Sequence, residues 1–302
     1  MHLPSTKLPL RRAAIAAVTG GALLATAASA HATIYIGGNG PNIQQAPLAG
    51  GKARTLASAH GGPDAIAATA SSVYWSNNSG NGNVDTINRV SVSGSGYKGR
   101  FVKGANSVDA LATTTSTLFI GLENSIGTSK LDGMSPKLNL IPNTGNIESI
   151  AIGGGYVYWT ASEGTTIGRA NLDGSSPNPS FMTVSDVNDI AVSPQGIYWS
   201  NDAGTAIGKA NLDGTSPNPS FITGMAQVGE VAAHGNYLYW TDAGGQIGPC
   251  DGPSCIPSQP GPTAGSIDRA TLAGTGMTKV VKGLNNPFTL AVVADPKRPK
   301  RR

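Results

Sequence analysis

Short apolar runs recur along the whole chain and are separated by turns rich in Gly, Asn, Asp and Pro. The clearest run is an aliphatic residue, Tyr, Trp and then Ser or Thr. It occurs in four places, Val73–Ser76, Val157–Thr160, Ile197–Ser200 and Leu238–Thr241. Beyond residue 30, no window of ten or more residues has the 3.6-residue period of an amphipathic helix. The pattern therefore predicts an all-β chain.

The runs belong to a repeat. Two degenerate copies, Ile34–Gly37 and Leu118–Gly121, fill the gaps between the four clear ones. The Trp position of the six copies falls at residues 36, 75, 120, 159, 199 and 240, so the repeat is 39 to 45 residues long. A constant period of this length is typical of proteins built from stacked structural repeats.

Each unit contains four short apolar runs, which predict four strands. In the fifth unit they are Ile190–Val192, Ile197–Ser200, Ala206–Leu212 and Phe221–Thr223. Asp213-Gly214 follows the third run, and an Asp-Gly pair between apolar runs is a strong hairpin signal.

The composition of the strands predicts how the sheets pack. The second run of each unit is apolar at consecutive positions, and successive strand residues face opposite sides, so both faces of each sheet must be covered. Blades arranged radially around an axis do this, and small residues in the first run fit the narrow space near the axis. Gly168 and Gly208, inside the third runs, predict a close backbone approach. We therefore predict a six-bladed β-propeller over residues 31–293.

The two ends of the chain are predicted to complete one blade. Thr33–Gly37 is a second-type run with no first-type run between it and residue 31. Residues 289–293 have the first-run pattern and follow the sixth unit. We expect this C-terminal strand to join the first blade, which closes the ring and hides sheet edges.

The repeat carries a family resemblance. Tyr-Trp-Thr/Ser-Asp/Asn followed by "IGxANLDG" resembles the YWTD repeats of the low-density-lipoprotein-receptor class B propellers, and "LYWTDAGG" (Leu238–Gly245) is the closest match. The resemblance covers almost all of residues 33–293, but the first and third units lack Trp and the family's Asp is kept only at Asp202 and Asp242. It implies a six-bladed fold and a bacterial-like, secreted protein-binding module. The residues it implies to be scaffold are Trp75, Trp159, Trp199, Trp240 and Asp242.

Residues 1–30 have the pattern of an export signal. Lys7, Arg11 and Arg12 precede an Ala-rich apolar stretch that ends in Ala28-Ser29-Ala30, a small-x-small cleavage site. The alternative is an uncleaved membrane anchor, but the stretch is short and rich in Ala and Gly. We expect cleavage, a secreted, extracellular or periplasmic protein, and no transmembrane segment after it.

The charge distribution argues against nucleic-acid binding. Charged residues make up 13% of the chain and the net charge is +4. Loss of the three positive charges in residues 1–30 leaves +1, and the basic tail, residues 294–302, holds five positive charges. Residues 31–296 are therefore about −4, without the basic patch that nucleic acid requires. The tail is interpreted as a solvated terminus, with contact to anionic cell-surface polymer as the alternative.

The insertion at residues 243–265 holds Cys250 and Cys255. In an exported protein these two are expected to form one disulfide, because a zinc site needs more ligands than this pair. Long loops in compact folds are usually functional or disordered, and a disulfide favours the first. We place a partner site where this insertion overhangs the axis.

Acidic residues recur at the starts of the first strands, the face where most propellers meet their ligands. They are Asp64, Asp109, Glu148, Asp189 and Glu230. One hypothesis is an acidic ring at the channel mouth that binds a cationic ligand or a divalent cation, Ca²⁺ or Mg²⁺. The other is that each carboxylate caps backbone N–H groups of its own loop. His60 precedes a first strand on the same face.

Two functions compete. The first is a binding module for a protein or a glycan on this face, which we expect to be a monomer. The second is a metal-dependent propeller enzyme of the gluconolactonase or virginiamycin B lyase type, since those enzymes are similar in length and repeats. The lactonase type would draw on Glu148, Asn188 and Asp64, whereas the lyase type's Glu-x-His pair is missing. Because fold alone does not decide function, the sequence leaves catalysis open.

Overall fold

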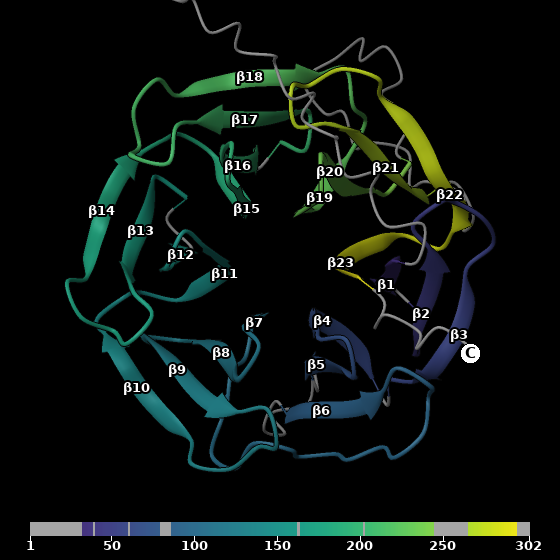
Figure 1. Ribbon diagram of the computed structural model, residues 1–302, viewed down its shortest axis with the longest axis vertical. Helices are drawn as coiled ribbons and strands as arrows, with labels where there is room; N and C mark the ends of the chain where they lie inside the picture. Colours follow the sequence, from purple (N-terminus) through teal and green to yellow (C-terminus); the bar gives the residue numbers. More distant parts are fainter. Residues whose placement is uncertain are drawn as a thin grey trace, which may run out of the picture.

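The computed structural model describes residues 32–38, 40–59, 61–78, 86–161, 164–201, 203–244 and 265–294. Within these ranges 23 strands form six antiparallel sheets, arranged as blades around a central axis (Figure 1). The described residues contain no helix, and so none that would span a membrane. The all-β, six-bladed propeller predicted from the repeat is confirmed.

Each blade takes its strands in order from the axis outward. Blade 1 is β23 (Pro287–Ala294), β1 (Ala32–Gly38), β2 (Asn42–Pro47) and β3 (Arg54–Ser58); blade 2 is β4 (Gly62–Ala68), β5 (Ser72–Asn78) and β6 (Thr86–Ser91); blade 3 is β7 (Ala110–Thr113), β8 (Thr117–Leu122), β9 (Ser125–Lys130) and β10 (Lys137–Pro142); blade 4 is β11 (Ile147–Gly153), β12 (Tyr156–Ala161), β13 (Thr166–Asn171) and β14 (Asn178–Thr183); blade 5 is β15 (Val187–Ser193), β16 (Gly196–Asn201), β17 (Ala206–Ala210) and β18 (Asn218–Thr223); blade 6 is β19 (Val228–His234), β20 (Tyr237–Asp242), β21 (Gly265–Thr271) and β22 (Thr278–Leu284).

The C-terminal strand closes the ring, as the sequence predicts. β23 pairs antiparallel with β1, from Ala32↔Ala294 to Ile36↔Leu290, and becomes the innermost strand of blade 1. It also lies against β19 of blade 6 and β4 of blade 2 (Figure 1). The strand from the end of the chain thus joins three blades.

Blade 2 departs from the predicted four strands. Only three are regular, and a single bridge, Arg89↔Lys98, takes the place of the outermost strand. The preceding segment turns at Gly94 and Gly96, both with positive φ, a conformation that glycine adopts without steric cost. The ring of Tyr97 then folds back to within 5.9 Å of the Trp75 ring, centroid to centroid.

One apolar cluster fills each interface between neighbouring blades, and the aromatic–Trp pair explains why. Neighbouring residues of a strand face opposite sides, so the aromatic residue of one blade meets the Trp position of the next. The six meetings are Tyr35 with Trp75, Tyr74 with Ile120, Phe119 with Trp159, Tyr158 with Trp199, Tyr198 with Trp240, and Tyr239 with Ile36. All four Trp side chains are at most 2% exposed, which supports their assignment as scaffold.

Glycine in the third strand is required by the Trp ring. A Cβ added to Gly208 would lie 2.2 Å from Cε2 of Trp199, and one added to Gly168 would lie 2.1 Å from the same atom of Trp159. The predicted close approach is therefore correct at both positions, but an indole ring, and not another backbone, makes it.

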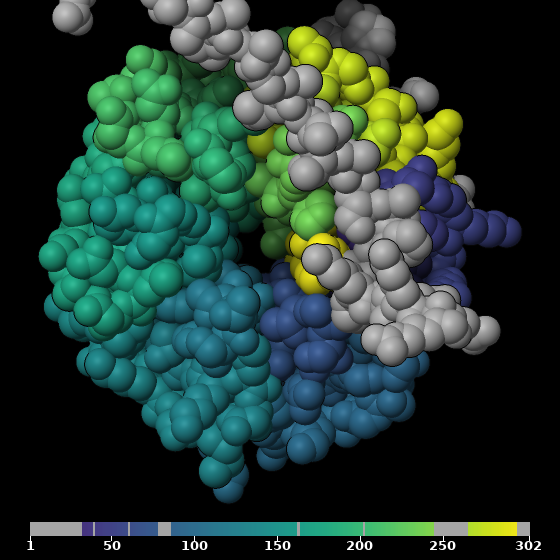
Figure 2. Space-filling view, in the orientation of Figure 1, coloured from purple at the N-terminus to yellow at the C-terminus, as the bar shows by residue number. Residues whose placement is uncertain are grey.

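The innermost strands surround a channel along the axis, and Figure 2 shows the hollow at the middle of the ring. Further along the innermost strands, the channel holds a cavity of about 210 Å³ lined mainly by Ala, Val, Ile and Leu. Small side chains at these positions fit the narrow axis, as expected.

Several sequence-based predictions lie outside the described residues. They are the export signal at residues 1–30, His60, Asp202, the Cys250–Cys255 disulfide with most of its insertion, and residues 295–302 of the basic tail. These remain predictions.

Candidate functional site

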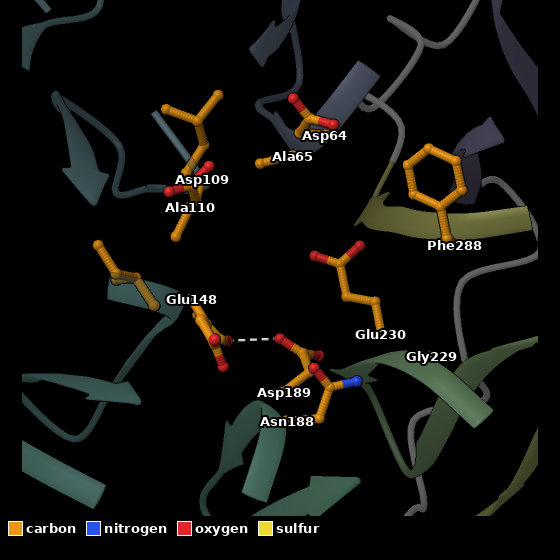
Figure 3. A pocket seen from close by; sticks show the side chains of 13 residues that line it. Asp64, Ala65, Asp109, Ala110, Glu148, Asn188, Asp189, Gly229, Glu230 and Phe288 are labelled. Carbon is orange, nitrogen blue, oxygen red and sulfur yellow. Dashed lines mark hydrogen bonds between the residues drawn. The ribbon is translucent and has the colours of Figure 1, made fainter. Parts of the chain in front are cut away.

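A polar cavity opens where the innermost strands begin. Its volume is about 250 Å³, and its walls come from all six blades (Figure 3). The lining residues are Asp64, Ala65, Asp109, Ala110, Leu111, Glu148, Ser149, Ile150, Asn188, Asp189, Gly229, Glu230 and Phe288.

The cavity brings together the acidic residues predicted from the repeat. All five carboxylates line it, with Asn188 beside them, and no basic residue is among the described residues of its wall. Glu148 is exposed, whereas the other four carboxylates are partly buried. The described wall therefore carries carboxylates from five blades and no basic side chain.

The strand register divides the five carboxylates into two classes. The Trp position of each blade pairs with one innermost residue, for example Ile150↔Trp159 and Ile190↔Trp199. The residue two positions before that partner is Asp64 in blade 2, Asp109 in blade 3, Glu148 in blade 4, Asn188 in blade 5, Gly229 in blade 6 and Phe288 in blade 1. The residue one position before the partner is, in the same order of blades, Ala65, Ala110, Ser149, Asp189, Glu230 and Thr289.

Backbone irregularities direct these side chains into the cavity. In five of the six described pairs of innermost and second strands, the register shifts at this level, as between Ile147 and Ser149 in blade 4. A β-bulge bends its strand and changes the direction of the side chains beside it. The bulges thus let residues on neighbouring positions line the same opening.

The class nearer the Trp partner forms bonds between blades. Ser149 Oγ accepts a hydrogen bond from the Ile190 backbone N–H at 3.2 Å and donates one to Asp189 Oδ1. Asp189 Oδ2 accepts one from the Val231 N–H at 2.5 Å. Blades 4, 5 and 6 are connected in this way at the cavity wall, and Figure 3 shows the bond that reaches Asp189.

Glu230 continues the same series to the closing strand. Its Oε2 accepts a hydrogen bond from the Leu290 N–H of β23. The hypothesis of capping was therefore partly correct for Asp189 and Glu230, since both bind backbone N–H groups. The groups reached in the next blade are the Val231 and Leu290 N–H, which lie outside the residue's own loop, while Asp189 also accepts from the Ile190 N–H of its own strand.

Burial sets the protonation of this pair. It raises the pKa of Asp189 to about 6, opposed by the hydrogen bonds from Ser149, Val231 and Ile190. The pKa of Glu230 is raised well above its usual value by burial and, next, by the charge of Asp189. Near neutral pH the pair therefore holds protons more tightly than free carboxyls do.

The fold is expected to lose stability as pH rises from 5 to 7, through this pair. The folded state binds more protons than the unfolded state between the ordinary Asp pKa of 3.8 and about 6, so the free energy of unfolding falls across that window. The Asp189 contribution between pH 5 and 7 is about 1 kcal/mol. Asp189→Asn should remove the Asp189 part and leave a shallower slope from buried Glu230, as measured by urea unfolding at both pH values.

His234 also makes the stability depend on pH, so the slope of Asp189→Asn has to be compared with that of the wild type. Burial lowers its pKa, so its neutral form is favoured and stability falls as pH drops through its ordinary value of 6.5. That opposing slope is the same in both proteins and cancels in the difference. An equal pH slope in wild type and Asp189→Asn would contradict the assignment.

The cavity does not have the geometry of a preformed metal centre. Glu148, Asn188 and Asp64 do line one cavity, as the lactonase hypothesis requires. Among the described residues, however, no three His, Cys, Asp or Glu side chains lie close enough together to hold a metal ion. Ca²⁺ or Mg²⁺ at the mouth therefore stays a prediction, and we derive no reaction step through it.

Asp242 contributes to the scaffold. It is 5% exposed, and its Oδ1 accepts a hydrogen bond from the Gly244 N–H at 2.7 Å, just after β20. This local bond lies in the turn at the end of the strand.

Seven lining residues were not among the predicted site residues, and Ser149 is the one of them that bonds to a predicted carboxylate. The signal for Ser149 was available. Counting back from the Trp partner puts it level with Asp189 and Glu230, whereas counting from the small-residue strand does not.

Comparison with solved structures establishes the fold. A chain in the crystal structure of a nidogen/laminin complex is 15% identical, with a TM-score of 0.68 over 86% of this chain and 98% of that one. TolB from Acinetobacter baumannii is 12% identical, with a TM-score of 0.62 over 89% of this chain and 68% of that one. No protein-family model and no curated protein sequence matches.

Proposed function

We propose that this chain is an exported β-propeller binding module, and that its ligand carries a cationic group bound at the channel mouth. The observation behind the proposal is the gathering of five carboxylates around one cavity of about 250 Å³, with no basic residue in its described wall. A protein partner that presents a Lys or Arg side chain has the matching chemistry.

The two classes of carboxylate take different parts in this proposal. Asp189 and Glu230 bind backbone N–H groups of the next blade, and burial raises the pKa of both. Asp64, Asp109 and Glu148 stand at the other class of position, and their carboxylates line the same cavity. A guanidinium is suited to such a site, because its donors spread over a plane and reach several carboxylates at once.

The likeness to a chain of a nidogen/laminin complex supports a role in protein binding, since a propeller of similar build takes part in that complex. The sequence of residues 1–30 supports export. A protein ligand is therefore proposed ahead of a glycan at this site.

The double variant Asp64→Asn, Asp109→Asn tests the proposal. An arginine-rich peptide is the probe, and the variant should weaken its binding about tenfold or more, because two charges facing the ligand are lost. The measurement is titration calorimetry at two salt concentrations, and higher salt should weaken wild-type binding further.

The double variant Asp132→Asn, Asp213→Asn is the matched control, because it also removes two negative charges, from equivalent exposed turns of blades 3 and 5. Asp132 is exposed in the turn between β9 and β10, at the opposite end of the blade, and Asn retains the side-chain oxygen that accepts the Met134 N–H. Equal weakening by this variant would mean that only net charge matters. Peptide binding untouched by the double variant would refute the site, and a stoichiometric divalent metal would favour the hydrolase alternative.

A further inference from the structure

A lateral cavity lies outside the channel, lined by blade 4 and by the loop that joins β10 to β11. Its volume is about 400 Å³, and Trp159 forms part of its wall. The described lining residues are Asn143, Thr144, Gly145, Asn146, Trp159, Ala161, Gly164, Thr165, Thr166, Pro179 and Ser180. A cavity of this size falls within the range of small-molecule sites.

The walls of this lateral cavity are held in place by hydrogen bonds. Asn124 holds one wall, because its backbone oxygen accepts from the Asn143 N–H at 3.1 Å and its side-chain oxygen accepts from the Gly145 N–H at 3.3 Å. Gly164 holds the other, donating to the Ala161 oxygen at 2.8 Å and accepting from the Val187 N–H at 3.0 Å. A site with fixed walls loses little conformational entropy on binding.

In blade 2 the corresponding indole is that of Trp75, and other residues of the protein cover it. Trp75 Nε1 donates to the Ala59 oxygen at 3.1 Å, and Ala59 precedes β4 as residues 143–146 precede β11. The Tyr97 ring lies against the same indole. In blade 4 the structure shows no such bond from Trp159 to a described residue, and Trp159 lines the lateral cavity instead.

The chemistry of the lateral cavity differs from that of the channel mouth. Its described wall contains no charged side chain and offers Asn, Thr and Ser groups, which both donate and accept hydrogen bonds. The indole N–H adds a donor on an apolar ring. Such a wall matches an uncharged ligand with several hydroxyl groups, and a charged ligand would find no counterion among the described wall residues.

We propose that the lateral cavity is a binding site for a neutral sugar. Hydroxyl groups of the sugar would bond to the Asn, Thr and Ser side chains and to Trp159 Nε1, in the place that blade 2 fills with Tyr97 and the Ala59 carbonyl. This site is separate from the proposed cation site and does not depend on it.

Filling the cavity tests the proposal, and the repeat supplies a matched control. Ser180 is exposed on β14 and lines the cavity, so Ser180→Tyr places a ring there. Ser220 holds the same place in the identical Asn-Pro-Ser-Phe segment of β18 but lines neither this cavity nor the channel. Ser220→Tyr therefore makes the same chemical change at the same strand position.

The measurement is an NMR titration with glucose and with N-acetylglucosamine, following the four indole N–H signals of the protein. One of these sugars should shift the Trp159 signal and leave the Trp199 signal in place. Ser180→Tyr should raise the apparent dissociation constant about tenfold or more, and Ser220→Tyr should not change it. Asn146→Ala, which only removes hydrogen-bonding groups, should weaken binding as well.

The proposal is overturned if neither sugar shifts the Trp159 signal, or if the shift survives in Ser180→Tyr. Equal loss in Ser180→Tyr and Ser220→Tyr would also overturn it, because the effect would then follow the substitution and not the cavity.

Discussion

A chain that ends at residue 286 is expected not to form a cooperative fold. It lacks β23, so β1 loses its inner partner and the ring has a gap next to the axis. Ile34 and Ile36, at most 1% exposed, would meet water, and Glu230 would lose the Leu290 N–H. These losses fall on a total stability of about 5–15 kcal/mol. Circular dichroism during thermal unfolding should show no sharp transition.

A chain that ends at residue 294 is the control, because it retains all of β23. It should unfold at nearly the same temperature as the full chain. A synthetic peptide of residues 285–296 should restore a transition to the shorter chain, since an added strand can complete an open sheet edge. A sharp transition without the peptide, close to that of the full chain, would contradict closure by β23.

Gly208→Ala is expected to destabilise the protein by about 3 kcal/mol or more, an effect of overpacking in a filled core. The new Cβ would lie 2.2 Å from Cε2 of Trp199, a side chain that is 1% exposed and packed between blades 4 and 5. The free energy of unfolding from urea titration is the measurement.

Gly62→Ala makes the same chemical change in a strand where nothing lies within 4 Å of the new Cβ. It should change stability by less than about 1 kcal/mol. If Gly208→Ala proved as mild as this control, the indole could not be packed over residue 208 as the structure shows.

The fold was predictable because the aromatic and aliphatic residues that fill its core recur from repeat to repeat. The Trp spacing gave the number of blades, and the aromatic–Trp pair determines which side chain faces which neighbouring blade. Closure by residues 289–293 was predictable for the same reason, since a missing first strand at one end matched an extra one at the other. The missing outer strand of blade 2 was not, because Tyr97 packs on Trp75 through a turn with no repeat counterpart.

The sequence predicted which acidic residues share the cavity, but not how their side chains are arranged and bonded. The five carboxylates do share one cavity. Their division into two classes depends on bulges that move the register by one residue, and bulges leave no clear mark in a single sequence. The bonds from Asp189 and Glu230 to the next blade join residues about 40 and 60 positions apart, so they depend on the assembled ring. The lateral cavity arises from loop packing and has no sequence motif.

The central claim is that closing the ring creates a cation-binding site at the channel mouth. A crystal structure of the protein with the bound arginine-rich peptide tests it most directly. The account predicts a guanidinium inside the cavity, in contact with at least two of Asp64, Asp109 and Glu148. A peptide bound elsewhere on the surface, with this cavity holding only solvent, would contradict it.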